Sequence, residues 1–236
     1  MTECPGLSHR LATMAELAEL RTLMAASIRK LIGAYLDAAR VEASFEIMGV
    51  DTQLIEDGTY FVVECERRIV GCGGWSRRAT LFGGDHSGGR DARLLDPARE
   101  PARVRAMYTR PDFARRGVGR LVLSLCEAAA AREGFRSLEL VATVAGEPLY
   151  LACGFSMIER IEVPTSKAVT VPWCPYGEAN HSHPVELTSF GKKQIRARAM
   201  LVSLVRIRLG VVLDRPTRRC TDGRTVHERP RVSAEP

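Results

Sequence analysis

The stretch MYTRPDFARRGVGRLVL, residues 107–123, decides the fold because it joins two kinds of periodicity within a few residues. Its apolar start alternates as a strand does and ends at Arg110 and Pro111. After the two glycines, Leu121 opens an apolar face with the three- to four-residue spacing of a helix, and Gly134 ends that pattern. The stretch therefore predicts a strand, a short bend and a helix over about 118–133.

The bend has the composition of an anion-binding turn. The first N–H groups of a helix have no intrahelical partners and lie at the positive end of the helix dipole. Gly117 and Gly119 lack Cβ atoms, so a phosphate can approach these amides closely. Arg115, Arg116 and Arg120 add positive charge around the same turn. We expect a phosphate-bearing ligand here.

Two familiar phosphate motifs are excluded by spacing. A P-loop needs four residues between its glycines and then Lys followed by Ser or Thr, and the turn has neither feature. A dinucleotide fingerprint needs a third glycine at position 122, where Val122 stands. The ligand is therefore expected to be of another class.

Together with LYLACGF (149–155), the turn resembles the GNAT superfamily of N-acetyltransferases. The second motif is carried by Tyr150, Gly154 and Phe155, and the resemblance covers about residues 8–175. It implies an α/β (α+β) fold with a mixed, mostly antiparallel central sheet of about six to seven strands flanked by helices.

The chain departs from the family pattern at two positions. Ala114 stands where many members have Gln or Arg before the first glycine. Val144 stands where many members have an Asn that reaches the amide arm of the cosubstrate. The second departure puts that single contact in doubt and leaves the backbone contacts of the turn unaffected.

The resemblance implies an enzyme that transfers an acetyl group from acetyl-CoA directly to a primary amine. It implies that the backbone of Met107, Tyr108 and Thr109 pairs with the pantetheine arm, and that Tyr150 protonates the departing thiolate. It assigns the pyrophosphate to Arg115, Arg116, Gly117, Val118, Gly119, Arg120 and Leu121. A catalytically weak CoA-binding sensor or interaction module, which would not depend on Tyr150, is the alternative.

The general base is left open by the sequence. The candidates are a water chain and five carboxylates on or near the predicted hairpin and the following strand, namely Asp51, Glu56, Glu64, Glu66 and Glu139. Each of these carboxylates also fits a solvated position on a strand or turn. Two aromatic residues share this ambiguity: Trp75 fits either the acceptor pocket or the core, and His86 fits a solvated loop better than a catalytic role.

The rest of the chain predicts a mixed order of elements. Apolar spacing indicates one or two helices over about 14–40, preceded by a capping box from Thr13 to Glu16. YFVVE and IVGCGGW predict a hairpin joined at CERR. Further elements are expected as a long loop over about 81–102, strands over about 137–143, 156–163 and 167–173, and a helix over about 147–153.

Positive charge is concentrated in the C-terminal part. The formal net charge is +6, but residues 190–236 alone carry 12 Lys and Arg against 4 Asp and Glu, a net of +8. We therefore expect a GNAT domain over residues 1–187 and a basic, flexible extension over 188–236. The extension has few aromatic residues, which disfavours nucleic acid as a partner.

No other cofactor or location signal stands out. Cys174, His181 and His183 lack the second ligand pair of a metal motif, so we expect no metal. No apolar run reaches the roughly 20 residues that cross a bilayer, and we expect a cytoplasmic protein without a membrane span. The acceptor is expected to be a small-molecule or protein amine, with a homodimer as an open possibility.

Overall fold

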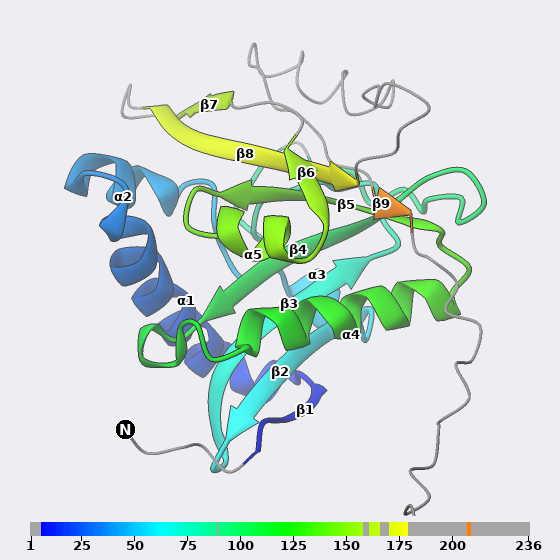
Figure 1. Cartoon of the computed structure of the whole chain (residues 1–236), viewed down its shortest axis with the longest axis horizontal. Helices are drawn as coiled ribbons and strands as arrows, with labels where there is room; N and C mark the ends of the chain where they lie inside the picture. The colour runs from blue at the N-terminus through cyan, green and yellow to red at the C-terminus, as the bar shows by residue number, and fades with distance from the viewer. Residues whose placement is uncertain (1–5, 89, 158–160, 166–169, 179–206, 209–236) are drawn as a thin grey trace, which may run out of the picture.

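A computed structural model describes residues 6–88, 90–157, 161–165, 170–178 and 207–208 (Figure 1). The strands are β1 (Ser8–Leu11), β2 (Tyr60–Cys65), β3 (Arg68–Ser76), β4 (Ala102–Thr109), β5 (Ser137–Thr143), β6 (Phe155–Met157), β7 (Ile161–Pro164), β8 (Thr170–Glu178) and β9 (Ile207–Arg208). The α-helices are α1 (Leu17–Leu31), α2 (Ala38–Ser44), α3 (Thr52–Glu56), α4 (Val118–Arg132) and α5 (Glu147–Ala152). Single 3-10 turns are η1 (Met14–Glu16), η2 (Ile32–Ala34) and η3 (Pro111–Phe113).

The described strands form one mixed sheet. Its main path runs β1-β2-β3-β4-β5-β8-β6, while β7 pairs with β8 and β9 pairs with β5. Every pair is antiparallel except β4 with β5. The seven strands of the path, with helices on both faces, confirm the expected fold class, and the two short strands bring the described sheet to nine.

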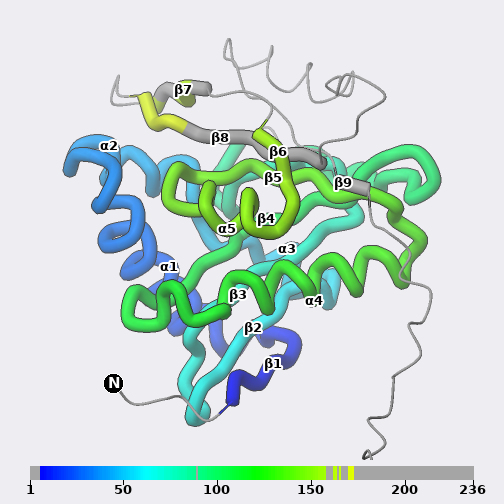
Figure 2. The backbone as a smooth tube through the Cα atoms, viewed as in Figure 1, coloured from blue at the N-terminus to red at the C-terminus, as the bar shows by residue number. Residues whose placement is uncertain are grey.

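Each face of the sheet carries its own hydrophobic core. Because side chains alternate along a strand, Val63 of β2 packs with α4 residues such as Val122, while Val62 packs with α1 residues such as Leu20. α4 therefore covers one face, and α1 and α3 cover the other (Figure 1). In Figure 2, α1 also approaches the turn before α4, and α1 contacts η3.

Strand β4 leaves its parallel partner early. Residues Ala102–Val104 pair with Leu138–Leu140, and no further pair with β5 follows. Ala106 then has a φ of 52°, and the register between β3 and β4 shifts at this point. A bulge of this kind bends the strand and changes the direction of the following residues. The two central strands consequently diverge toward the start of α4.

Several local predictions are confirmed. Helix α4 begins at Val118, β5 covers Ser137–Thr143, and the carboxylate of Glu16 accepts a hydrogen bond from the Thr13 backbone at 2.7 Å. The N-terminal helical region consists of α1 and α2 rather than one helix. Strand β1 and helix α3 were not expected. Most of the predicted extension 188–236 lies outside the described residues, so that boundary stays a prediction.

Candidate functional site

A cavity of about 660 Å³ opens where β4 and β5 diverge. The last paired residues are Val104 and Leu140, and the wall includes β4 from Val104 to Thr109 and β5 from Val141 to Thr143. One end of the cavity is formed by the turn before α4 and by α5. The other end is formed by the C-terminal end of α1 with η2, the segment 47–49 and the loop 81–83.

The turn before α4 is shaped by two residues with left-handed backbone. Arg115 has a φ of 62° and Gly117 a φ of 84°. A Cβ atom at Gly117 would meet nothing within 4 Å, so its glycine serves the conformation. Gly119 serves space instead, because a Cβ there would lie 2.9 Å from Cδ2 of Leu149. The turn therefore has open space beside Gly117, while Gly119 allows close packing against Leu149 of α5.

Most of the predicted cosubstrate residues line this one cavity. They are Met107, Tyr108, Thr109, Arg115, Gly117, Val118, Gly119 and Arg120. Two of the predicted residues do not line it. The guanidinium of Arg116 lies 5.2 Å from the centre of the Phe113 ring, and Leu121 packs against the core beneath α4. The amide of Leu121 already donates to the carbonyl of Gly117 at 2.9 Å, so only Arg116 can contribute to the turn, through its backbone amide and its charge.

Tyr150 also lines the cavity, from helix α5. Its side chain is 93% buried, its ring lies 5.5 Å from that of Phe155, and its hydroxyl donates to Sδ of Met107 at 3.6 Å. Burial raises the pKa of Tyr150 well above its usual value. The hydroxyl is therefore protonated throughout the neutral range and faces a residue of β4.

None of the five carboxylates considered as a general base lines the cavity. Glu139 forms a buried ion pair with Arg103 on the neighbouring strand. Glu64 pairs at 2.7 Å with Arg10 near the outer edge of the sheet. Among the described residues, the cavity wall contains no Asp or Glu.

The remaining candidates have other surroundings. Asp51 is fully buried and pairs with two arginines. Glu66 lies in the β2–β3 turn with a φ of 51°, and Glu56 is exposed at the end of α3. Trp75 is 1% exposed and packs edge to face against Phe135 at 5.8 Å, which is the core alternative of the two that the sequence left open.

Sequence reasoning missed the end of the cavity opposite the anion-binding turn. Ser27 and Lys30 of α1, Tyr35 after η2 and the loop 81–83 with Phe82 all line it. These residues come from two segments about fifty positions apart, so no local pattern links them. Lys30 is charged and Phe82 is apolar, so this part of the wall is amphipathic.

The described part of the chain contains no group of three or more His, Cys, Asp or Glu side chains that could hold a metal ion. His181 and His183 lie outside the described residues. Within the described ranges, no helix is long and apolar enough to span a bilayer.

Comparisons with known proteins agree with this geometry. Residues 56–157 match the family model described as an acetyltransferase (GNAT) domain. A GCN5-related N-acetyltransferase from Rhodopseudomonas palustris is similar in structure, with a TM-score of 0.54, 15% identity and coverage of 75% of this chain and 97% of that one. A putative acetyltransferase from Salmonella typhimurium, solved with acetyl-CoA, gives a TM-score of 0.49, 16% identity and coverage of 77% and 99%. No curated protein matches the sequence.

The matched range contains β2 to β6, the anion-binding turn and Tyr150. The structural similarity extends beyond this range, since three quarters of the chain is covered. Residues 56–157 are thus similar to a GNAT acetyltransferase domain, and the similarity to solved structures shows the same fold.

Proposed function

We propose that this chain is an N-acetyltransferase that moves the acetyl group of acetyl-CoA directly to a primary amine. The observation that carries the proposal is the single cavity that joins the start of α4, the free edge of β4 and the hydroxyl of Tyr150. The phosphates of an acyl donor would bind the N–H groups at the start of α4. Its amide-bearing arm would pair with the free edge of β4.

The start of α4 would hold the pyrophosphate. The amides from Arg116 to Arg120 lie at the positive end of the helix dipole, whereas that of Leu121 is used within the helix, and Arg115 and Arg120 line the cavity. The arm would pair with the backbone of Met107, Tyr108 and Thr109, since β4 has no strand partner on that side beyond Val104 in the described chain. One of those amides would polarise the thioester carbonyl.

The reaction needs a neutral amine, a C–N bond formed and a C–S bond broken. The attacking nitrogen loses one proton and the departing sulfur gains one. Tyr150 is the group that would supply the second proton, because its raised pKa keeps the hydroxyl protonated. The absence of a carboxylate from the described wall favours water in the cavity as the acceptor of the first proton.

The finer points of the function are proposals too. The acceptor is a small-molecule or protein amine, and the amphipathic end formed by Lys30, Tyr35 and Phe82 is where it would enter. The cytoplasmic location, the absence of a bound metal and the possible homodimer stay predictions from the sequence.

Calorimetric titration of the full chain tests the donor site. We expect micromolar affinity for acetyl-CoA and no binding of a nicotinamide dinucleotide, with dephospho-CoA showing how much the 3′-phosphate contributes. Gly119→Asp should weaken acetyl-CoA binding at least about 100-fold, because a like charge against the phosphates costs several kcal/mol.

Gly119→Ala is the matched control. Its methyl group would meet only the flexible end of Leu149, so affinity should stay within about tenfold of the wild type, or 1.4 kcal/mol. Equal affinity in the Asp variant and the wild type would overturn the site assignment.

A thiol-release assay then separates transfer from simple binding. Acetyl-CoA is offered with agmatine, an aminoglycoside, an amino-acid amide and a peptide with a free N-terminus. Amine-dependent thiol release supports the transferase. Binding of acetyl-CoA without release by any amine would favour the sensor module.

A further inference from the structure

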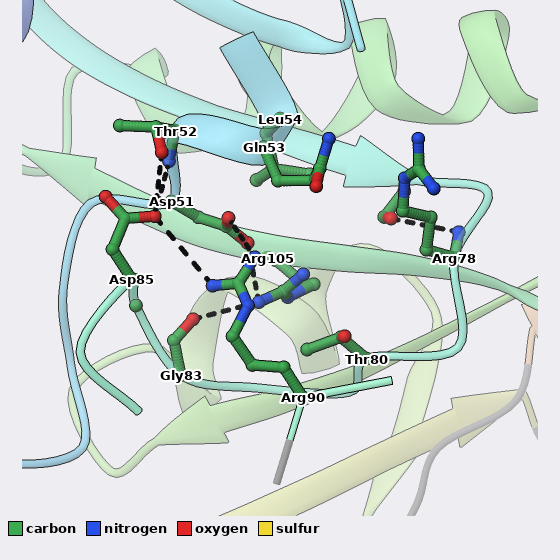
Figure 3. Close-up of polar contacts among 12 residues, drawn as sticks. Asp51, Thr52, Gln53, Leu54, Arg78, Thr80, Gly83, Asp85, Arg90 and Arg105 are labelled. Atoms are coloured by element: carbon green, nitrogen blue, oxygen red, sulfur yellow. Dashed lines mark hydrogen bonds and ion pairs between the residues drawn. The ribbon is translucent and has the colours of Figure 1, made fainter. Parts of the chain in front are cut away.

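One buried carboxylate, that of Asp51, connects three segments next to the cavity (Figure 3). Its Oδ2 lies 2.6 Å from Nη2 of Arg105 on β4, and its Oδ1 accepts a hydrogen bond at 2.6 Å from Nη2 of Arg90 on the long loop. Asp51 itself precedes α3. Strand β4, the loop and α3 therefore meet at one side chain.

The loop end of this cluster is held at several points. Nη2 of Arg105 also donates to the carbonyl of Gly83 at 2.9 Å. The carboxylate of Asp85 accepts from the backbone and the hydroxyl of Thr52 at 2.9 and 3.0 Å. A Cβ at Gly84 would lie 2.6 Å from Cα of Gly49, so the two backbones are in direct contact. These contacts hold Gly83, Gly84 and Asp85 as a wall against β4, Thr52 and Gly49.

That wall belongs to the cavity. Gly83 lines it together with Phe82, and Gly49 lines it together with Met48. All four lie at the end opposite the anion-binding turn, where the amine is proposed to enter.

The other end of the cluster lies next to the bulge of β4. Arg105 immediately precedes Ala106, the residue with left-handed backbone. The carbonyl of Ala106 accepts a hydrogen bond at 2.8 Å from the hydroxyl of Tyr60, and the hydroxyl of Tyr108 donates to the carbonyl of Gly49 at 3.1 Å. Because a non-glycine residue in this conformation is strained, it persists only where its surroundings hold it.

The charges of the cluster depend on each other. Asp51 is 0% exposed, and the side chain of Arg105 is 3% exposed. Burial lowers the pKa of Arg105 to about 10, and the charge of Asp51 opposes that effect. Removing the negative charge would leave a buried guanidinium without its counter-ion, which destabilises its position far more than loss of an exposed pair.

We propose that Asp51 is a positioning residue, which through Arg105 fixes the bulge of β4 and through Arg90 fixes the wall of the acceptor end. The inference rests on the proposed function and assigns separate roles to two parts of the site. The α4 turn sets affinity for the donor, while the Asp51 cluster sets the geometry of the thioester segment and the fit of the amine.

The test compares Asp51→Asn with Asp57→Asn in the full chain. Asp57 forms a similar pair with Arg78, with hydrogen bonds of 2.7 and 2.8 Å, but neither residue lines the cavity. In Asp51→Asn, amide exchange in peptides covering 80–91 and 103–109 should rise at least about tenfold, because these segments lose their common anchor. In Asp57→Asn both peptides should rise no more than peptides elsewhere in the sheet, since a loss of global stability raises the exchange of all of them alike.

Kinetics supply a readout that a purely structural role would not move. With the amine that gives the fastest thiol release, Asp51→Asn should lower kcat/KM at least about 30-fold while the Kd for acetyl-CoA stays within about threefold. Arg90→Gln, whose wild-type side chain is 24% exposed and pairs with Asp51 and Asp85, should raise KM for the amine and leave kcat nearly unchanged. This variant also serves if Asp51→Asn does not fold.

Three outcomes would overturn the inference: equal exchange in the two Asn variants, unchanged amine kinetics in both Asp51→Asn and Arg90→Gln, or a loss of acetyl-CoA affinity as large as that of Gly119→Asp. A wild-type chain that does not bind acetyl-CoA would instead refute the proposed function. The exchange comparison keeps its meaning in that case, since it needs no ligand.

Discussion

Gly71 on β3 determines how closely α4 approaches the sheet. A Cβ atom at this position would lie only 2.2 Å from Cγ1 of Val118, the first residue of α4, and 3.3 Å from the carbonyl oxygen of Tyr108. Carbon atoms in ordinary contact are about 3.5 to 4.0 Å apart. Gly71→Ala therefore requires the start of α4 to move by more than about 1 Å or Val118 to leave its rotamer.

The expected cost follows from overpacking in a dense core. Val118 is 1% exposed, so it cannot turn into solvent. We expect Gly71→Ala to lower the free energy of unfolding by about 2 kcal/mol, which corresponds to about 4 to 8 °C in Tm for a domain of this size. The same displacement moves the anion-binding amides, so acetyl-CoA affinity should fall roughly tenfold, or 1.4 kcal/mol.

Denaturant unfolding followed by circular dichroism measures the stability, and calorimetric titration measures the affinity. Val118→Ala alone should cost roughly 2 kcal/mol through lost burial. The double variant should be about 1 to 2 kcal/mol more stable than the sum of the two single effects, since each change relieves the other. Strict additivity, or a Gly71→Ala variant as stable as the wild type, would refute the packing argument.

Two further predictions concern protonation. Tyr150→Phe should lower kcat at least about tenfold with little change in the Kd for acetyl-CoA, and because burial raises the pKa of Tyr150, the wild-type rate should show no decline from this group between pH 7 and about 9.5. A falling limb below that range that disappears in Tyr150→Phe would contradict the assignment. The hydrogen bonds from Arg78 lower the pKa of Asp57 below its ordinary value of 3.8, so the stability that the pair adds is present above about pH 4 and is lost as the pH falls further. Asp57→Asn should cost about 1 to 2 kcal/mol at pH 7, and thermal melts should show the gap to the wild type closing toward pH 2; a constant gap would show that the carboxylate is not the cause.

The sequence predicts the parts of this fold that depend on local order. The Gly-Val-Gly turn and the helix from Val118 combine conformational freedom, charge and periodicity within a few residues, so their meaning does not depend on distant contacts. The strand Ser137–Thr143 is bounded by clear breaks. Strand β1 was missed because all four of its residues are exposed, and α3 because five residues are too short to establish a helical period.

The candidate site divides in the same way. The donor end was predicted from two motifs, since a helix N-terminus binds anions wherever it stands. The acceptor end and the Asp51 cluster were not predicted as assemblies, because Asp51, Arg90 and Arg105 come from three distant segments. From the sequence, Glu139 was as good a candidate for the general base as Asp51. Only the register between β4 and β5, which places Glu139 opposite Arg103, shows that Glu139 forms an ion pair.

Because β4 and β5 diverge early, the concentration of the acetyl donor would affect the stability of the folded protein and therefore its lifetime. Beyond Val104 and Leu140, β4 and β5 no longer pair with each other. A donor bound between them would take the place of a strand in the interior of the sheet. A ligand at about 100 times its Kd adds roughly 2.7 kcal/mol to the stability of the folded state. Without the donor, the chain would unfold at a lower temperature and would be accessible to proteases for a larger fraction of the time. Its abundance would then depend on the concentration of acetyl-CoA.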